Sequence, residues 1–311
     1  MTKYSVLSSF SSLNGPAVTL FASWQLRYAF FRYSLFGWMI SFKSVLGPLS
    51  DLSILCIIGL YCFIIFQTDS HDQIRTSTRM GTDAVDAVTM LNLILPGSAC
   101  VYYGSEIGLE ESMIRDDQKT DKAADSINYL RDTSRGPMPW DDTKNGGFTT
   151  NKTPWLPLST KYWSSNVKNQ LQEANSHLKI FKRLMTLRKT VAAKYGDLKT
   201  HVVNTWTYMF TRNASNEIIA VVINLGSESE AICSEESNLC LPETMFVHTG
   251  SLNSGFKIGD EVRIISSKGH SCTELRPKAG LVLTTYPTSA AIVWSSASWL
   301  LILGMGIITL R

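Results

Sequence analysis

The stretch from residue 64 to residue 106 most constrains how this chain can fold, because it alternates short apolar segments with polar ones. A first apolar segment at residues 64–66 is followed by the polar run SHDQIRTSTRMG. A second, at residues 99–103, is followed by Gly104 and the acidic Glu106. Each apolar segment has the length of a short buried strand, so the pattern predicts two strands with polar groups after each.

A helix is predicted between the two strands. Thr82 or Asp83 can cap its start, and Pro96-Gly97 stops it. Strand, helix and strand with polar groups after each strand form the unit of an α/β barrel, in which chemistry gathers at the carboxyl ends of the strands. The apolar side chains that recur at helical spacing are Val85, Val88, Leu91, Ile94 and Leu95.

Three motifs in this region resemble family 13 glycoside hydrolases. SHDQIRTSTRMG resembles the segment around that family's third catalytic carboxylate, usually written Asn-His-Asp. VYYGSEIGLE is similar to the last barrel strand of the α-glucosidase branch, usually YYGEEIGM. RDTSRGPMPWDD with NGGF resembles that branch's RDxxRTPMQWD and AGF motifs. The likeness is greatest to insect-type maltases and runs from residue 70 to the C-terminus.

The resemblance implies an α/β region followed by an all-β region. Residues 70–192 correspond to the last strands and helices of a truncated (β/α)8 barrel, and residues 193–287 to a small antiparallel β-sandwich. A single amphipathic helix is predicted at residues 166–189 from Val167, Leu171, Ala174, Leu178, Phe181 and Met185. The period-two segments that predict strands are HVVNTWTYMFTR, EIIAVVINLG, EVRIIS and GLVLTTY.

The resemblance also assigns site residues. It makes Asp72 the carboxylate that binds sugar hydroxyls and stabilises the oxocarbenium-like transition state, with His71 donating to the same sugar. Arg135 matches an arginine that reaches the bound glucose, and Arg131 lies four residues before it. A guanidinium suits sugar hydroxyls because its donors form a fixed fork. The chain departs from the family pattern at Ser70, Ser105, Gly136 and Pro139.

Each assignment has a plainer alternative. A surface His71–Asp72 pair needs no ligand, and the two arginines can hold their loop through Asp132 and Asp141. Tyr102 and Tyr103 are expected to have a structural role. The aromatic residues that either stack on sugar rings or anchor the loop are Trp140, Phe148 and Trp155.

The activity implied is retaining hydrolysis of terminal α-1,4-linked glucose from maltose or short α-glucooligosaccharides, with no metal or organic cofactor. In the family the nucleophile Asp and the acid/base Glu lie on the fourth and fifth barrel strands. This chain lacks those strands, so we expect it to be inactive alone. One alternative is a non-catalytic, membrane-displayed binding protein. Another is that two strands of a barrel with an open edge do not fold stably.

The two ends of the chain suggest a membrane. Residues 1–69 are unassigned, and their apolar stretch is open to three interpretations: a signal anchor, the remnant of a barrel strand, or an artefact of a wrongly assembled gene model. Residues 288–311 are arranged like a glycosylphosphatidylinositol attachment signal with Ser289 as the attachment site, or form a retained hydrophobic tail. We therefore expect an anchored protein on the extracellular face of the cell surface.

Cysteines and sequons agree with that location. Cys233 and Cys240 suit a local disulfide, although two reduced surface thiols remain the alternative, and the spacing of the six cysteines is not that of a zinc site. Asn213 and Asn151 lie in glycosylation sequons. The formal charge of +3 does not imply a nucleic-acid partner. The sequence gives no signal for an oligomeric state.

Overall fold

The structure is a computed structural model that describes residues 65–122, 130–203, 205–214, 217–232, 241–264 and 273–287. These residues belong to one compact unit. The expectations for the anchor segments at either end, including Ser289, lie outside the described residues, as does the pairing of Cys233 with Cys240.

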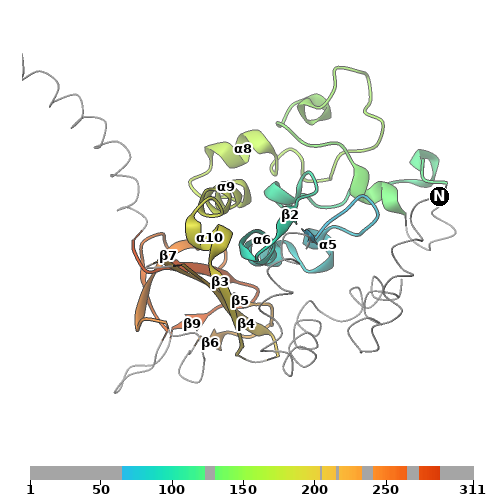
Figure 1. The fold of residues 1–311 in the computed structure, drawn as a ribbon. Coiled ribbons are helices and arrows are strands. Elements are labelled where there is room, and N and C mark those ends of the chain that lie inside the picture. Colours follow the sequence, from blue (N-terminus) through green and yellow to red (C-terminus); the bar gives the residue numbers. More distant parts are fainter. Residues whose placement is uncertain are drawn as a thin grey trace, which may run out of the picture. The chain divides into compact units, whose positions relative to one another are not determined.

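The predicted strand, helix and strand are present in the predicted order. β1 (Ile65–Gln67) pairs in parallel with β2 (Ser98–Cys100), with Phe66 opposite Ala99. Between them lies α6 (Val85–Ile94), nine of whose ten residues are buried. A helix buried all round needs cover on every side. It has that cover because α6 lies between α9 and the strands β5 and β10 (Figure 1).

The parallel pair has open sides. Each strand of a complete barrel has a neighbour on both sides, whereas within the described residues β1 and β2 pair only with each other. The side chains of Ser98, Cys100 and Val101 are exposed. The pair is consistent with the end of a barrel, while the truncation itself remains a prediction.

Short helical turns link these elements. Most are single 3₁₀ turns within long loops, and Ser112 and Ser159 form an isolated antiparallel bridge between two of the loops. The short elements are α5 (Thr76–Arg79), η2 (Thr82–Ala84), η3 (Ser105–Ile107), η4 (Asp116–Gln118), η5 (Arg131–Arg135) and η6 (Lys144–Gly147).

The single helix predicted for residues 166–189 is wrong, because the chain forms two helices there. They are α8 (Val167–Gln172) and α9 (His177–Leu187). Ser176 caps the second, since its Oγ accepts a hydrogen bond from the backbone N of Lys179 at 3.3 Å. A serine N-cap starts a separate helix, so the residues before and after it do not share one continuous helical face.

The apolar face predicted for this helix is confirmed at Leu178, which is buried, and wrong at three other positions. Leu171, Ala174 and Met185 are exposed. A short helix, α10 (Val191–Tyr195), follows and leads into the β region. The side chains that α9 buries are Leu178, Ile180, Leu184 and Leu187.

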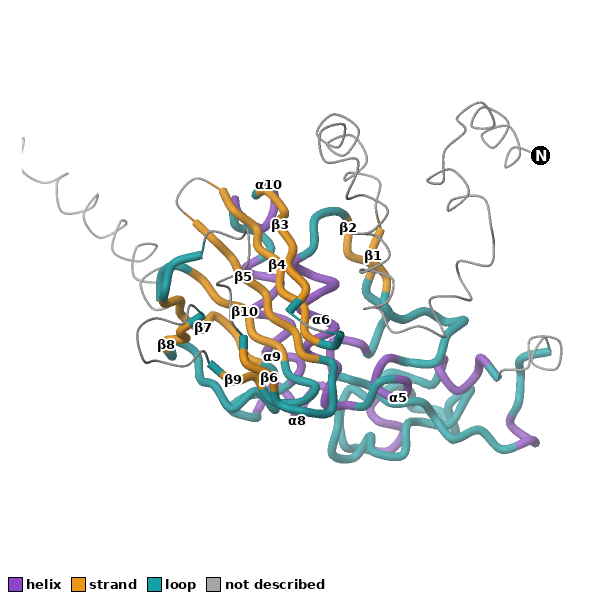
Figure 2. Tube along the Cα trace, turned by 90° about the horizontal axis from the view of Figure 1, so that it is seen from below, coloured by secondary structure: helices purple, strands orange, loops and turns teal. Residues whose placement is uncertain are grey.

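The second half of the described chain is antiparallel. Six strands form one sheet in the order β3-β4-β5-β10-β7-β8, and β6 pairs with β9 in a second, two-stranded sheet (Figure 2). Their bounds are β3 (Asp197–Val202), β4 (Thr207–Ala214), β5 (Glu217–Asn224), β6 (Glu230–Ala231), β7 (Thr244–Gly250), β8 (Glu261–Arg263), β9 (Glu274–Leu275) and β10 (Gly280–Thr284).

Two strand predictions need correction. The segment HVVNTWTYMFTR is not one strand, because β3 ends at Val202 and β4 begins at Thr207. The sequence prediction also omits β7, although its buried Met245 and Val247 alternate with less buried neighbours at the period of a strand.

Both faces of the six-stranded sheet are buried. One face shares an apolar core with the two-stranded sheet: Met209, Val222 and Leu281 of the large sheet belong to the same core as Leu275 of β9 and Ile232, which directly follows β6. The other face packs against α6 and α10. An antiparallel β region therefore follows the barrel-like part, and helices cover the face that does not meet the small sheet.

The buried carboxylate of Asp86 joins the helices to the β region. Its Oδ1 lies 2.7 Å from Nδ1 of His177 on α9, and its Oδ2 accepts a hydrogen bond from the backbone N of Leu252 at 3.0 Å. Burial lowers the pKa of His177, but the hydrogen bond and charge of Asp86, with the charge of Glu173, outweigh it, so that this pKa is raised. The pair is an ion pair when His177 is protonated.

We predict that Asp86→Asn destabilises the protein by about 3 kcal/mol or more, because it breaks a buried pair. Since the pKa of His177 is raised in the folded protein, the ion pair's contribution to stability is fully present below the pKa of the unfolded state, about 6.5. That contribution is lost as pH rises through the pKa of the folded state. Urea unfolding from about pH 5 to pH 9 measures this loss.

The exposed Asp83→Asn serves as a control at the start of the same helical segment, and should retain the pH dependence of the parent. An Asp86→Asn protein with the same pH dependence as the parent would contradict the account.

Candidate functional site

The turn after β1 is held by a buried carboxylate. Asp69 accepts hydrogen bonds at Oδ1 from the backbone N and the hydroxyl of Thr76, at 2.6 and 2.7 Å, and at Oδ2 from the hydroxyl of Ser105, at 2.6 Å. Ser105 stands where the family has Glu, and here it fixes the turn. Ser70, in place of the family's Asn, accepts from the backbone N of Asp72 at 3.2 Å.

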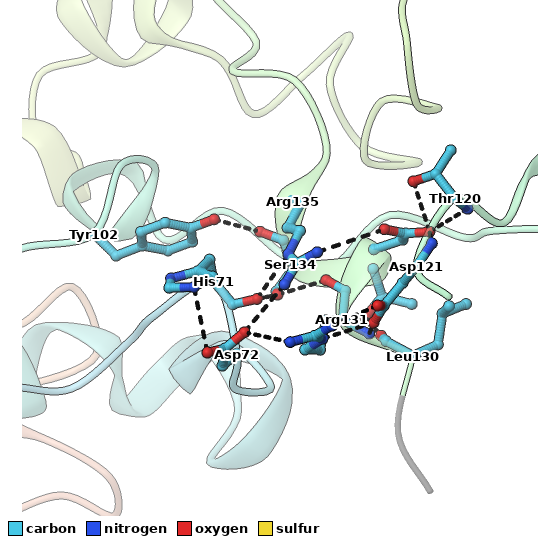
Figure 3. A network of polar contacts seen from close by, with 11 residues as sticks. His71, Asp72, Tyr102, Thr120, Asp121, Leu130, Arg131, Ser134 and Arg135 are labelled. Carbon is cyan, nitrogen blue, oxygen red and sulfur yellow. Dashed lines mark hydrogen bonds and ion pairs between the residues drawn. The ribbon is translucent and has the colours of Figure 1, made fainter. Parts of the chain in front are cut away.

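The structure brings the four predicted site residues together around Asp72 (Figure 3). Its Oδ1 lies 3.2 Å from Nη1 of Arg131 and 3.0 Å from Nη2 of Arg135, and its Oδ2 lies 3.3 Å from Nε2 of His71. Arg135 also donates from Nε to the carbonyl oxygen of His71 at 2.9 Å. Because the side chains of Asp72 and His71 are 48% and 65% exposed, this cluster can reach a solute.

Arg131 is held mainly by Asp121, which the sequence did not indicate. Its Nε and Nη2 donate to the two oxygens of this buried carboxylate at 2.7 and 2.5 Å. These hydrogen bonds raise the pKa of Arg131 by more than burial lowers it. Asp121 thus fixes the Arg131 guanidinium, which also forms an ion pair with Asp72.

A second buried carboxylate, Asp132, supports the same loop. Its Oδ2 accepts from the backbone N of Thr120 at 2.6 Å and from that of Asp121 at 2.8 Å, and its Oδ1 lies 4.0 Å from Arg135. Asp141, the other acid considered for holding the arginines, instead accepts from the backbone N and the hydroxyl of Thr143. Holding the loop therefore involves Asp121 and Asp132.

A buried arginine connects β2 to this loop. Arg75 is 1% exposed, and its guanidinium carbon lies 4.9 and 5.1 Å from the ring centroids of Tyr102 and Tyr103. It donates to the carbonyl oxygens of Tyr103 at 2.9 Å and of Ser134 at 2.8 Å. A cation held over an aromatic face contributes about 0.5–2 kcal/mol, with the larger value where water is excluded.

The two tyrosines reach the same loop. The hydroxyl of Tyr102 donates to the carbonyl oxygen of Ser134 at 3.4 Å, and that of Tyr103 to Gly136 at 2.7 Å. Burial, first, and then the neighbouring Tyr103 raise the pKa of Tyr102, so its hydroxyl remains a donor at neutral pH. Burial also raises the pKa of Glu106, at the end of the same segment.

Gly136 explains one departure from the family pattern. A Cβ at this position would lie 2.0 Å from Oγ of Ser112 and 3.1 Å from the carbonyl oxygen of Pro157. The family's Thr does not fit here, yet the loop still delivers Arg135 to Asp72.

The remaining predicted residues lie apart from the cluster's contacts. Trp140, Phe148 and Trp155 are 51%, 43% and 57% exposed, so they are free to meet a ligand rather than serving as buried anchors. Asn151 is exposed in a loop, whereas Asn213 is half-buried in β4. Within the described ranges no group of His, Cys, Asp and Glu could hold a metal ion. Among those same residues, no helix has the length and apolar character to span a bilayer.

Known proteins match this chain over part of its length. Residues 61–196 match the family described as the alpha amylase catalytic domain. Maltase A1 of Drosophila melanogaster is 32% identical over 170 residues, which cover 52% of this chain and 30% of that protein. The alpha-glucosidase of Culex pipiens is 31% identical over 234 residues, which cover 75% of this chain and 37% of that protein.

A solved structure agrees. An isomaltulose synthase from Erwinia rhapontici is 25% identical with a TM-score of 0.57, over 72% of this chain and 43% of that one. The chain spans about a third of the length of the curated relatives it matches.

We predict that Gly136→Ala destabilises the protein by about 1–3 kcal/mol, because the added methyl group overlaps Ser112. Combining it with Ser112→Gly should restore part of the loss, and Ser112→Gly alone completes the double-mutant cycle. Denaturant unfolding measures all four proteins. If the changes in unfolding free energy of the two single variants add up to that of the double variant, contact with Ser112 is not the reason why Gly136→Ala is destabilising.

Proposed function

We propose that this chain is the C-terminal part of an α-glucosidase, because residues 61–196 match the alpha amylase catalytic domain and because the chain is similar to insect proteins named maltase and alpha-glucosidase. Asp72, His71 and Arg135 would hold a terminal glucose unit of maltose or a short α-1,4-linked oligosaccharide. One observation carries the proposal: an exposed carboxylate in the turn after a parallel strand, held between two arginines and a histidine.

The cluster is suited to binding a sugar. A carboxylate accepts hydrogen bonds from vicinal hydroxyls, and it stabilises the positive charge that develops on the ring during glycoside cleavage. The histidine and the guanidinium of Arg135 supply donors beside it. This chemistry requires neither a metal nor an organic cofactor.

We propose that the chain alone does not cleave the bond. Retaining hydrolysis needs two carboxyl groups across the scissile bond, about 5–5.5 Å apart. The carboxylates that share the arginines with Asp72 are those of Asp121 and Asp132, and the side chains of both are buried, at 3% and 1% exposure. Neither is available as a nucleophile or as a proton donor to a sugar.

The alternative is a protein displayed on a membrane that binds a sugar or another ligand without catalysis. The exposure of Asp72 beside a fixed set of donors supports binding without turnover. Location at the cell surface, lipid attachment at Ser289, glycosylation at Asn151 and the disulfide of Cys233 with Cys240 remain proposals.

We predict that the purified chain releases no glucose from maltose, because the supporting carboxylate cannot replace a nucleophile and an acid. A coupled glucose assay over several hours measures the release. Turnover that disappears in Asp72→Asn would contradict the proposed inactivity and would place a complete site in this chain.

We predict that the chain binds D-glucose and that Asp72→Asn weakens this binding about tenfold, because a charge-assisted hydrogen bond contributes about 1.5–3 kcal/mol. The matched control is Asp142→Asn, since Asp142 is 49% exposed and pairs with Lys168 at 2.8 Å. It should bind glucose like the parent. Equal affinities of all three proteins, measured by NMR titration, would exclude Asp72 as the sugar ligand.

A further inference from the structure

We propose that Arg75 is the positioning residue that aligns Arg135 with Asp72. The proposal concerns the same sugar-binding cluster and so rests on the proposed function. Arg75 itself touches neither Asp72 nor a solute, because it is 1% exposed and its guanidinium faces two tyrosine rings and two backbone carbonyls.

The burial of this charge needs a reason. A buried cation is costly unless it is paired or fully hydrogen-bonded. Within the described residues, Arg75 forms no ion pair at close range, although its charge acts on the carboxyl group of Glu106 and lowers the pKa of that group against the larger effect of burial. Its compensation comes from the rings of Tyr102 and Tyr103 and from the carbonyl oxygens of Tyr103 and Ser134. These contacts stabilise the guanidinium only in one orientation, so the carbonyls and the rings must keep their places around it.

Arg75 links the two ends of the Arg135–Asp72 contact. It follows Asp72 by three residues and precedes α5, whose start is fixed by Asp69. Its Nη2 donates to the carbonyl oxygen of Ser134, which belongs to the peptide group preceding Arg135. Fixing that peptide group fixes the point from which the Arg135 side chain extends.

The next peptide group is fixed in the same way. Tyr103, whose ring stacks on Arg75, donates its hydroxyl to the carbonyl oxygen of Gly136 at 2.7 Å. Arg135 is therefore flanked by two anchored carbonyls, and its Nε reaches the carbonyl oxygen of His71 while Nη2 reaches Asp72. Without Arg75, the Ser134 carbonyl keeps only the 3.4 Å hydrogen bond from Tyr102, and Tyr103 loses the cation that holds its ring.

A lysine cannot replace this arginine. The planar guanidinium donates in two directions at once and stacks flat on a ring, whereas an ammonium group is a point charge on a flexible stem. Arg75→Lys therefore keeps the positive charge and removes the two-directional hydrogen bonding. The variant separates the effect of the charge from the effect of the guanidinium geometry.

The test compares three variants of the whole chain. Arg75→Lys removes the fork, and Tyr103→Phe removes only the hydroxyl at Gly136. Arg188→Lys is the matched control, because Arg188 also donates from both Nη atoms to backbone carbonyls, those of Leu93 and Gly97, at the opposite end of β2. The readouts are the melting temperature, the D-glucose dissociation constant, and the NMR signal of the Arg135 Nε proton that is bonded to His71.

We expect Arg75→Lys to weaken glucose binding about tenfold, as loss of one well-aligned charged contact does, and to expose the Arg135 Nε proton to fast exchange. Tyr103→Phe should weaken binding about threefold, as loss of one neutral hydrogen bond does, and should speed the exchange of the Arg135 Nε proton. Arg188→Lys should lower the melting temperature and leave glucose affinity and the Arg135 signal as in the parent.

A folded Arg75→Lys protein with the parent's affinity and Arg135 signal would overturn the proposal. If Arg75→Lys does not fold, Tyr103→Phe decides, and an unchanged Arg135 signal in that variant overturns the proposal. If the parent binds no glucose, the proposed function fails, while the Arg135 proton signal still decides whether Arg75 aligns that side chain.

Discussion

The parallel pairing of β1 with β2 is the constraint on which the candidate site depends. Phe66 lies opposite Ala99, so the polar turn after β1 and the segment after β2 emerge at the same edge. Parallel strands require a crossover connection, and α6 supplies it. Arg75 can stack on Tyr102 and Tyr103 only because both segments leave the strands together.

Buried carboxylates fix the loops that follow the strands and are not held by strand pairing. Asp69 holds the turn that carries His71 and Asp72, and Asp132 holds the loop that carries the two arginines. Backbone and hydroxyl donors satisfy both oxygens of Asp69, as a buried charge requires, whereas Asp132 takes its donors at Oδ2 and has Arg135 4.0 Å from Oδ1. Asp86 performs the same task between the helices and the β region. The exposed cluster around Asp72 is thus supported by groups that cannot themselves meet a ligand.

Much of this arrangement was predictable from sequence because its signals are local. The apolar segments around α6 have the periods of strand and helix, and the motifs around Asp72 and Arg135 name the residues that meet. Asp121 and Arg75 were not predictable, because their partners are carbonyls and side chains set by the fold. The break before α9 was missed because one serine cap outweighs a continuous apolar stripe.

A crystal structure of the protein soaked with D-glucose tests the central claim most directly. We predict a pyranose whose hydroxyls lie within hydrogen-bond distance of the Asp72 carboxylate, with Arg135 donating to the same ring. The contradicting result is a cluster that stays empty, with Asp72 bonded only to protein donors, at a glucose concentration that saturates binding in solution.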